Sequence, residues 1–285
     1  MAASPGTFSP DLLEELDGFL VELNRAAAGA ILPLFRADPG LMDQGLVDKG
    51  GAHGFDPVTE ADKGAERAIR ALIAERYPAH GVIGEEYGED RPDAEFVWVL
   101  DPVDGTRAFV AGLPLWTTLI GLRWQGRPVL GSIGQSFLGE LYIGHAFADG
   151  AGASRVMTRG GARPLQVRPC PDIAAALIAT TDPETCFGPA EAAAWRDVRR
   201  VTRLARLGCD AYAYAMVAAG TMDLVLEAGL KAWDIDAAIP VVAGAGGLTT
   251  DWRGQPVGAF GGQVAIAGDR ACLGAALALL APAAN

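Results

Sequence analysis

The hydrophobic pattern of this 285-residue chain changes period along its length, and this change limits the folds that the chain can adopt. After Ser9, which can cap a helix, and Pro10, which fits a first helical position, apolar residues recur at helical spacing through Leu23. A second helical pattern begins at Thr59 and ends before Pro78. The sequence therefore predicts two amphipathic helices near the N-terminus, the first of them long.

The pattern then becomes that of short β-strands. Four segments are rich in β-branched and aromatic residues, and turns at Gln125-Gly126 and Leu138-Gly139 separate the last three. The segments are residues 96–100, 117–124, 129–135 and 140–146. This arrangement predicts an antiparallel meander in the N-terminal half.

Beyond a segment rich in Gly, Ala and Ser at residues 149–163, strand-like and helical runs alternate. The strand-like runs are residues 176–180, 224–227 and 264–267, and the helical runs are residues 190–201, 210–219, 235–244 and 271–280. We therefore expect two domains, an N-terminal α+β domain at residues 1–154 and a C-terminal α/β domain at residues 155–285.

The charge balance narrows the possible partners. The chain has 35 acidic and 23 basic residues, a net charge of −12, and such a surface repels nucleic acid and anionic membranes. The four cysteines match no CxxC pair or zinc-site spacing, which predicts reduced, mostly buried thiols. The N-terminus lacks the basic and apolar regions of a signal peptide, and no apolar run approaches the ~18 residues of a spanning helix. These features predict a cytoplasmic protein.

The most informative motif is VWVLDPVDGT at residues 97–106, where a strand of buried type ends in two carboxylates. Asp101 and Asp104 can converge on one point, and a divalent cation or a proton would relieve their repulsion. Oxygen ligands of this kind suit magnesium rather than zinc. The simpler alternative is a turn in which both aspartates bind backbone amides.

Three other acidic features accompany this motif. Glu85 follows a short apolar run, Asp234 begins a helix rich in apolar residues, and Asp62 completes a capping box with Thr59. Each has a local explanation, because Glu85 can be a solvated strand end and Asp234 can be an N-cap. Only their occurrence together indicates a site.

The four motifs taken together resemble the inositol monophosphatase family of magnesium-dependent phosphomonoesterases. They are DPVTEAD at residues 56–62, GEE at residues 84–86, DPVDGT at residues 101–106 and WDIDAA at residues 233–238, in the family's order and spacing. The resemblance implies a layered αβαβα fold, with an antiparallel sheet in the N-terminal half and a mixed sheet with helices in the C-terminal half.

The resemblance also implies two to three Mg²⁺ ions. Glu85, Asp101 and the Val103 carbonyl would hold one ion, and Asp101, Asp104 and Asp234 would hold the second. A weaker third ion would bind at Glu85. Four carboxylates and a phosphate monoester of about −2 charge cannot share a pocket without such cations.

The family's catalytic residues match positions in this sequence. Asp62 and Thr106 would orient the attacking water, with Glu85 also catalytic as a metal ligand. Backbone amides of Gly105 and Thr106 would receive phosphate oxygens, and Asp234 would also contact the substrate. The resemblance implies no covalent intermediate, since a metal-activated water can attack the phosphorus in line.

Other chemistries find little support. His53, His80 and His145 have no metalloprotease spacing, and there is no nucleophile elbow or Walker A sequence. The glycine-rich segment at residues 244–247 follows a helix, so it indicates a C-cap and not a dinucleotide loop.

The substrate is the least constrained part of the prediction. Residues 104–122 and 209–247 resemble the histidinol-phosphatase branch, although Trp233 stands where that branch usually has tyrosine and where inositol phosphatases often have tryptophan. Glu227, at the family's leaving-group position, would suit the cationic amine of histidinol better than a neutral polyol. The alternative for Glu227 is a solvated strand end. We therefore expect L-histidinol phosphate as substrate, with inositol 1-phosphate or another small phosphomonoester as the alternative.

A non-enzymatic alternative is an interaction module of the transcription machinery, a role found among relatives. A homodimer is also expected from the resemblance. The segment from Gly40 to Pro57 has no periodicity and predicts a mobile loop, in which Lys49 is either a residue that closes over the site or a solvated surface lysine.

Overall fold

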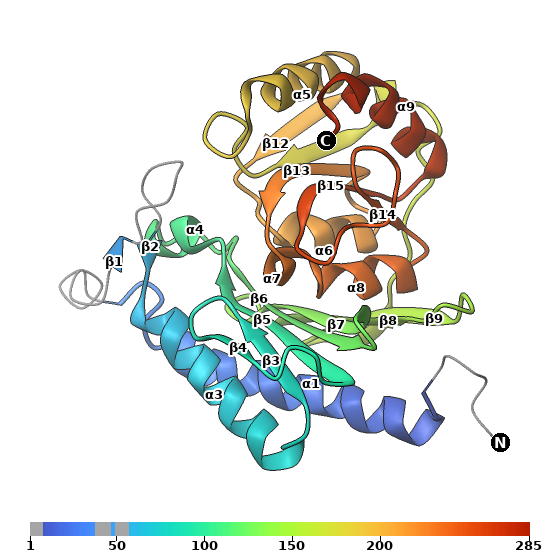
Figure 1. The fold of residues 1–285 in the computed structure, drawn as a ribbon. Coiled ribbons are helices and arrows are strands. Elements are labelled where there is room, and N and C mark those ends of the chain that lie inside the picture. Colours follow the sequence, from blue (N-terminus) through green and yellow to red (C-terminus); the bar gives the residue numbers. More distant parts are fainter. Residues whose placement is uncertain (1–7, 38–46, 49–56) are drawn as a thin grey trace.

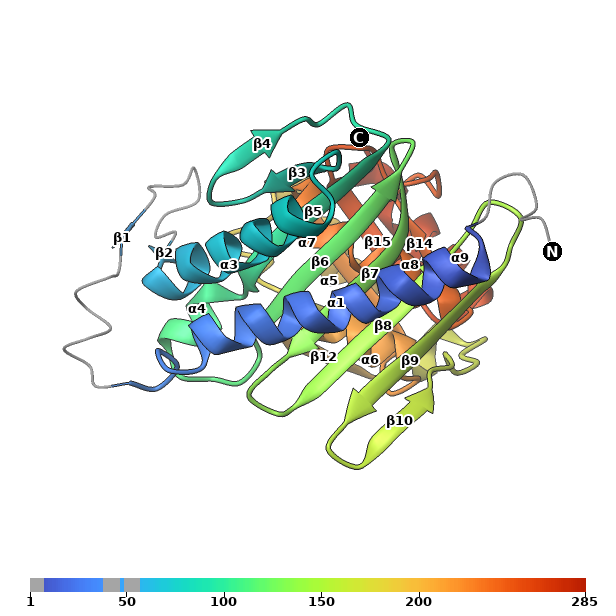
Figure 2. The same cartoon turned by 90° about the horizontal axis from the view of Figure 1, so that it is seen from below.

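The helices and strands stack in alternating layers in the computed structural model, which describes residues 8–37, 47–48 and 57–285 (Figure 1). Two helices, α1 (Pro10–Ile31) and α3 (Glu60–Arg76), form the first layer. Ser9 caps α1 by accepting a hydrogen bond from the Leu12 amide at 3.2 Å. Figure 2 shows both helices lying across one face of the first sheet. The predicted positions of both helices are confirmed.

The second layer is an eight-stranded sheet with the order β10-β9-β8-β7-β6-β5-β3-β4. Its strands are β3 (Gly81–Gly84), β4 (Gly88–Asp90), β5 (Phe96–Asp104), β6 (Thr117–Trp124), β7 (Arg127–Gln135), β8 (Glu140–Ala146), β9 (Gly152–Thr158) and β10 (Gly161–Pro164). The strands from β5 to β10 form an antiparallel meander. The Gln125-Gly126 turn has positive φ at both residues, 51° and 77°, as a tight hairpin requires.

Two features of this sheet differ from the sequence-based expectation. Strand β3 pairs with β5 in parallel, so the sheet is not wholly antiparallel. Strand β9 crosses the expected boundary at residues 154/155, and the β9–β10 hairpin extends the first sheet to Pro164. These strands were not predicted, because β9 is only partly buried, β10 is exposed, and both carry little apolar signal.

The third layer consists of α6 (Tyr212–Ala218), α7 (Ala232–Ile235) and α8 (Ala238–Gly244). Helix α8 contacts β7, β8 and β9. This contact is close, because a Cβ atom on Gly131 would lie 2.3 Å from the Ala237 carbonyl oxygen. One helix was expected at residues 235–244, but the chain breaks between α7 and α8. Pro240 explains the break, since it has no amide hydrogen for the carbonyl of Asp236.

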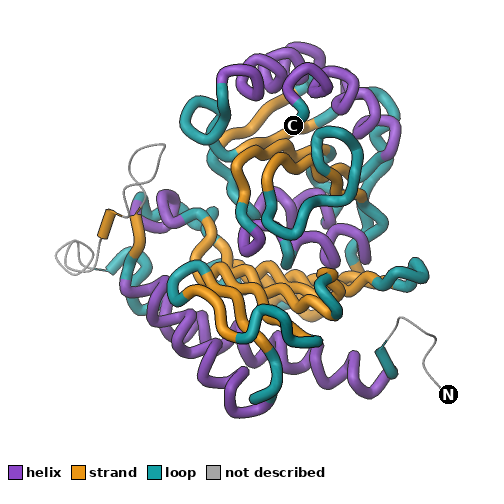
Figure 3. Tube along the Cα trace, viewed as in Figure 1, coloured by secondary structure: helices purple, strands orange, loops and turns teal. Residues whose placement is uncertain are grey.

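The fourth layer is a mixed sheet with the order β12-β11-β13-β15-β14, as the resemblance implied. Its strands are β11 (Leu177–Thr180), β12 (Leu204–Leu207), β13 (Leu224–Leu230), β14 (Leu248–Thr250) and β15 (Gly262–Ala267). Helices α5 (Pro189–Val201) and α9 (Arg270–Leu280) form the fifth layer, and Figure 3 shows the alternation of helix and strand through the molecule. The αβαβα arrangement is confirmed.

The remaining elements are short. They are β1 (Val47–Asp48), β2 (Pro57–Val58), α4 (Thr106–Val110) and the 3₁₀ turns η1 (Ile173–Ala175) and η2 (Ala281–Ala283). Most of the expected mobile loop, including Lys49 and His53, lies outside the described residues. Within the described part of the chain, no helix has the length and apolar character needed to cross a membrane.

Candidate active site

The end of strand β5 carries the two carboxylates that the sequence singled out. The pairing of β5 with β6 is regular as far as Asp101 and then shifts register before Asp104. Thr118 on β6 donates a hydrogen bond to the Pro102 carbonyl at 2.8 Å and so fixes the irregular segment. Asp101 is buried and Asp104 is half-buried. The irregularity therefore presents both aspartates at one end of the sheet.

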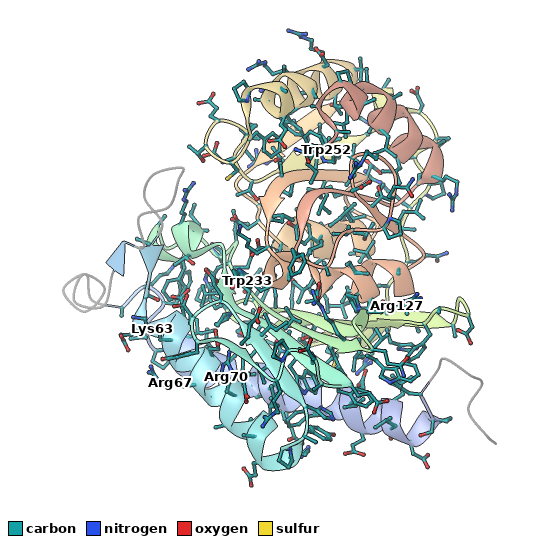
Figure 4. The ribbon with its side chains drawn as sticks, viewed as in Figure 1. Lys63, Arg67, Arg70, Arg127, Trp233 and Trp252 are labelled. Carbon is teal, nitrogen blue, oxygen red and sulfur yellow. The ribbon has the colours of Figure 1, made fainter. Side chains whose placement is uncertain are left out.

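Asp234 reaches the same place from α7 in the C-terminal half. One oxygen atom from each of Asp101, Asp104 and Asp234 lies within 4.8 Å of the other two. Asp234 occupies the third position of α7 and accepts a hydrogen bond from the Lys231 amide at 2.6 Å, so it is not the N-cap. In Figure 4, Trp233 lies at the junction of α7 with the first sheet. The structure thus brings together three of the four predicted acidic ligands.

Glu85 approaches from the neighbouring strand. Parallel pairing places Gly84 opposite Leu100, and the Glu85 amide donates a hydrogen bond to the Leu100 carbonyl at 3.2 Å. Glu85 therefore follows β3 beside Asp101, and its charge raises the pKa of both Asp101 and Asp104. Glu85 is not one of the residues whose carboxylate oxygens lie within 4.8 Å of one another.

Burial and mutual repulsion dominate the electrostatics of this cluster. Burial raises the pKa of Asp101 well above its usual range, and the charges of Glu85 and Asp104 raise it further. The pKa of Asp104 is also raised, first by burial and then by the charge of Asp210, while a hydrogen bond from the Ala211 amide at 2.7 Å opposes the shift.

These groups fit a hard divalent cation. Within the described residues, the buried Oδ1 atom of Asp101 has no hydrogen-bond partner. A buried, unpaired carboxylate oxygen among other acids is costly unless a proton or a cation joins it. Converging carboxylate oxygens with no sulfur or imidazole donor among them suit hard divalent cations such as magnesium, calcium and manganese.

Asp62 lies beside this cluster at the start of α3. Its Oδ2 atom accepts hydrogen bonds from the Thr59 amide and hydroxyl at 2.8 and 2.5 Å, which completes the predicted capping box. The hydroxyl of Thr106 lies 3.3 Å from the other oxygen, Oδ1, and 3.0 Å from the Val103 carbonyl. Burial raises the pKa of Asp62 to about 6, against the effect of the Thr59 hydrogen bonds. Asp62 and Thr106 are therefore brought together as expected.

Gly105 links β5 to the short helix α4. Its φ of 81° favours glycine, and a Cβ atom there would lie 3.1 Å from Oδ2 of Asp210. A side chain at this position would be strained by the positive φ and would require the Asp210 side chain to shift. Gly105 and Thr106 thus start α4 directly beside the acidic cluster.

Glu227 is buried on β13 and is not a solvated strand end. Its side chain accepts hydrogen bonds from the Thr180 hydroxyl at 3.1 Å and from the Thr181 amide and hydroxyl at 2.8 and 3.0 Å. Burial nevertheless raises the pKa of Glu227 to about 8, and the charge of Asp210 contributes. A high pKa despite three donors indicates a strongly desolvated carboxylate.

Asp210 is a site residue to which the sequence gave no role. It lies in the left-handed region with φ of 46°, and burial raises its pKa to about 6 while Arg107 opposes the shift. Asp210 also lines a cavity of about 650 Å³ to which α4 and α5 both contribute residues. Thr181, Asp182 and Trp195 are among the other residues that line this cavity. The unusual φ was not visible in the sequence, although aspartate tolerates it better than most residues.

Arg123 and Asp236 form a buried pair that joins the two halves. Arg123 on β6 donates two hydrogen bonds to the Asp236 carboxylate, one of them at 3.1 Å, and a third at 2.7 Å to the Ala259 carbonyl. Asp236 lies two residues after Asp234, so this pair holds the chain next to the acidic cluster. Neither residue had a predicted role.

Comparison with known proteins gives consistent matches. Residues 12–284 match the inositol monophosphatase family. The bifunctional phosphatase IMPL2 of Arabidopsis thaliana is 41% identical over 212 residues, which cover 74% of this chain and only 58% of the plant protein. A histidinol-phosphatase of Streptomyces coelicolor is 34% identical over 266 residues, with 92% and 95% of the two chains covered. The solved structure of an inositol monophosphatase from Zymomonas mobilis is 38% identical, with a TM-score of 0.79 over 94% of this chain and 98% of that one.

Proposed function

Because this chain belongs to the inositol monophosphatase family of phosphatases, we propose that it is a Mg²⁺-dependent phosphomonoesterase acting on L-histidinol phosphate. The single observation that supports this most strongly is the group of Asp101, Asp104 and Asp234 oxygen atoms within 4.8 Å of one another. Similarity to histidinol-phosphatases at 34% and 35% identity supports the substrate.

The ligands proposed for two to three Mg²⁺ ions are those that the resemblance implied. Asp101 would bind both main ions. Glu85 and the Val103 carbonyl would complete the protein ligands of the first ion, and Asp104 and Asp234 those of the second. Bound Mg²⁺ would neutralise the acidic cluster, lower the pKa of a bound water and balance charge on the phosphate.

Asp62 and Thr106 are proposed to hold and deprotonate the attacking water. The Thr106 hydroxyl and Asp62 Oδ1 lie 3.3 Å apart, so one water can contact both oxygen atoms. Thr59 occupies the other oxygen of Asp62, which leaves Oδ1 as the atom that takes the proton. A pKa near 6 keeps Asp62 ionised at neutral pH while it remains a useful base.

The amides of Gly105 and Thr106 are proposed to bind the phosphate oxygens. Gly105 supports this role because it is the N-cap of α4, so its amide and that of Thr106 lie at the start of that helix. Asp234 would contact the substrate as well as the metal. The proposed phosphate site at Gly105 and Thr106 directly follows the ligands at the end of β5.

Two buried carboxylates support an amine-bearing leaving group. Glu227 and Asp210 both have raised pKa values. Thr181 donates its amide and hydroxyl to Glu227, and a hydrogen bond with the same side chain opposes the rise for Asp210. An ammonium group near these acids would stabilise their charged forms, whereas a neutral polyol would not. Asp210 also lines the 650 Å³ cavity, which has room for the imidazole ring of histidinol.

The substrate proposal is tested by comparing phosphate release from histidinol phosphate and myo-inositol 1-phosphate at the same Mg²⁺ concentration. We expect kcat/KM to favour histidinol phosphate, and Glu227→Gln to reduce that preference by about tenfold, as expected for a hydrogen bond to a charged group. Preference for the inositol ester in the wild type would overturn the substrate and leave the phosphatase chemistry intact.

We also propose a homodimer in the cytoplasm. The edge strand β12 exposes Leu204 and Leu207 at 49% and 48%, and Val201 beside it is 43% exposed, which supports an apolar contact between copies. The four free cysteines support a reducing compartment. Sedimentation equilibrium should give twice the chain mass, and a monomer mass would contradict the dimer.

A further inference from the structure

Helix α3 contacts the turn that carries Glu85, in addition to providing Asp62. The turn comprises residues 85–87 and joins β3 to β4, whose pairing closes with Gly84 opposite Gly88. Asp62 and Glu66 lie one helical turn apart on α3, and both are buried. Glu66 is fully buried, with 0% exposure, and faces the turn.

The Glu66 carboxylate holds the turn through its backbone. Oε2 accepts a hydrogen bond from the Glu86 amide at 2.8 Å, and Oε1 accepts one from the Tyr87 amide at 3.2 Å. Arg70 donates to Oε1 at 2.7 Å and so balances the buried charge. A carboxylate that accepts from two successive amides fixes the orientation of the peptide group that directly follows Glu85.

Two arginines of the same helix also form hydrogen bonds with this turn or the residue that follows it. Arg67 donates a hydrogen bond to the Tyr87 hydroxyl at 2.6 Å, and Arg70 donates a second one to the Gly88 carbonyl. Figure 4 shows both arginines projecting from α3. The turn is therefore attached to α3 by the Glu66 carboxylate on its inner side and by the arginines on its outer side.

Gly84 shows how closely the carboxylate fits. A Cβ atom on Gly84 would lie 2.0 Å from Oε1 of Glu66 and 2.8 Å from the Arg70 guanidinium. Any side chain at Gly84 would push Glu66 away from the turn. The glycine of the GEE motif is thus explained by a contact with α3.

We propose that Glu66 is a positioning residue that orients Glu85 toward Asp101. This inference rests on the proposed function, because it assumes that Glu85 helps to bind Mg²⁺. Residues that orient metal ligands typically contribute 10- to 100-fold to metal affinity. Glu66 would hold Glu85 in place in the substrate-free protein, so its effect should be measurable on Mg²⁺ binding alone.

The test measures Mg²⁺ binding by calorimetry in chelator-treated protein without substrate. We expect Glu66→Ala to weaken Mg²⁺ binding about 10- to 100-fold and to speed amide exchange at Glu86 and Tyr87. The matched control is Glu191→Ala. Glu191 also accepts hydrogen bonds from a backbone amide, that of Gly188, and from the Gln263 side chain, both at 2.7 Å, but it lies on α5 in the C-terminal half. The control should leave Mg²⁺ affinity within about twofold of wild type.

A second variant separates positioning from a general loss of structure. Gly84→Ala keeps the Glu66 carboxylate but displaces it. As a single substitution it should weaken Mg²⁺ binding, and added to Glu66→Ala it should weaken binding little further. If Glu66→Ala does not fold, Gly84→Ala alone decides the question. Wild-type Mg²⁺ affinity in either folded variant would overturn the positioning role. Absence of Mg²⁺ binding in the wild type would instead overturn the proposed function.

Discussion

Two groups of buried aspartates in this protein differ in their surroundings. Asp223 and Asp236 each face an arginine: Arg168 lies 2.6 Å from Asp223, and Arg123 forms a buried pair with Asp236. Asp101 and its neighbours at the end of β5 face other acids instead. Asp101 is as buried as Asp223 and Asp236, and it differs from them in having acids rather than an arginine as charged neighbours.

The pKa values follow this difference in part. Hydrogen bonds and charge from Arg168 lower the pKa of Asp223 although burial opposes the shift. Burial raises the pKa of Asp236, and the hydrogen bond and charge of Arg123 reduce that rise. For Asp101, burial and four acidic neighbours all raise the pKa. Arginine compensates the charge of the first group within the fold, whereas the acids clustered with other acids need a proton or an added cation. This contrast separates structural carboxylates from candidate catalytic ones.

The largest expected effect comes from Asp101→Asn. Loss of the shared metal ligand should lower kcat/KM for phosphate release by at least about 10³-fold, which corresponds to the several kcal/mol a metal supplies. The thermal midpoint of the metal-free variant should not fall, because the substitution removes a charge from a repulsive cluster. Activity within tenfold of wild type would refute the ligand assignment.

Asp236→Asn should instead lower the stability of the protein. It leaves the buried Arg123 guanidinium without its partner, so the free energy of unfolding should fall by about 3–5 kcal/mol. The exposed pair of Asp197 and Arg200 is the control, since Asp197→Asn should change stability by less than about 0.5 kcal/mol. Chemical denaturation measures both. A stable Asp236→Asn variant would mean that arginine matching does not distinguish the two groups.

The pH dependence of stability should show the same contrast at a smaller scale. The pKa values of Asp62 and Glu227 are raised to about 6 and about 8, so each contributes stability below its unfolded pKa that is lost as pH rises through the folded value. Asp223 has a lowered pKa, and its contribution is lost only below about pH 4. The metal-free thermal midpoint should therefore fall by about 5 °C between pH 5 and pH 8. A flat or rising profile would contradict this interpretation.

Sequence reasoning predicted the fold where periodicity was strong. The first two helices and the strands at residues 117–124 and 140–146 have the predicted positions, because long amphipathic or alternating runs bury one face. The β9–β10 hairpin and the break before Pro240 were missed. Exposed strands lack an apolar pattern, and a helix break depends on one backbone hydrogen bond.

The candidate site was predictable only as a set of motifs. Asp101 and Asp104 share one strand end, so their proximity followed from local sequence. Asp234 comes from the other half of the molecule, and its approach depends on the Arg123–Asp236 pair, which has no sequence signature. The roles proposed for Asp210 and Glu66 depend on backbone conformation and on contacts between distant segments.

The most direct test is a calorimetric Mg²⁺ titration of chelator-treated wild type near pH 6, in two buffers with different ionisation enthalpies. We predict saturable binding of more than one Mg²⁺ per chain with release of protons, because burial and acidic neighbours raise the pKa of these carboxyl groups and Mg²⁺ binds their ionised form. Asp101→Asn should lose the binding and the proton release together. Absence of saturable binding at millimolar Mg²⁺, or binding unchanged in that variant, would contradict the claim that these acids form a cation site.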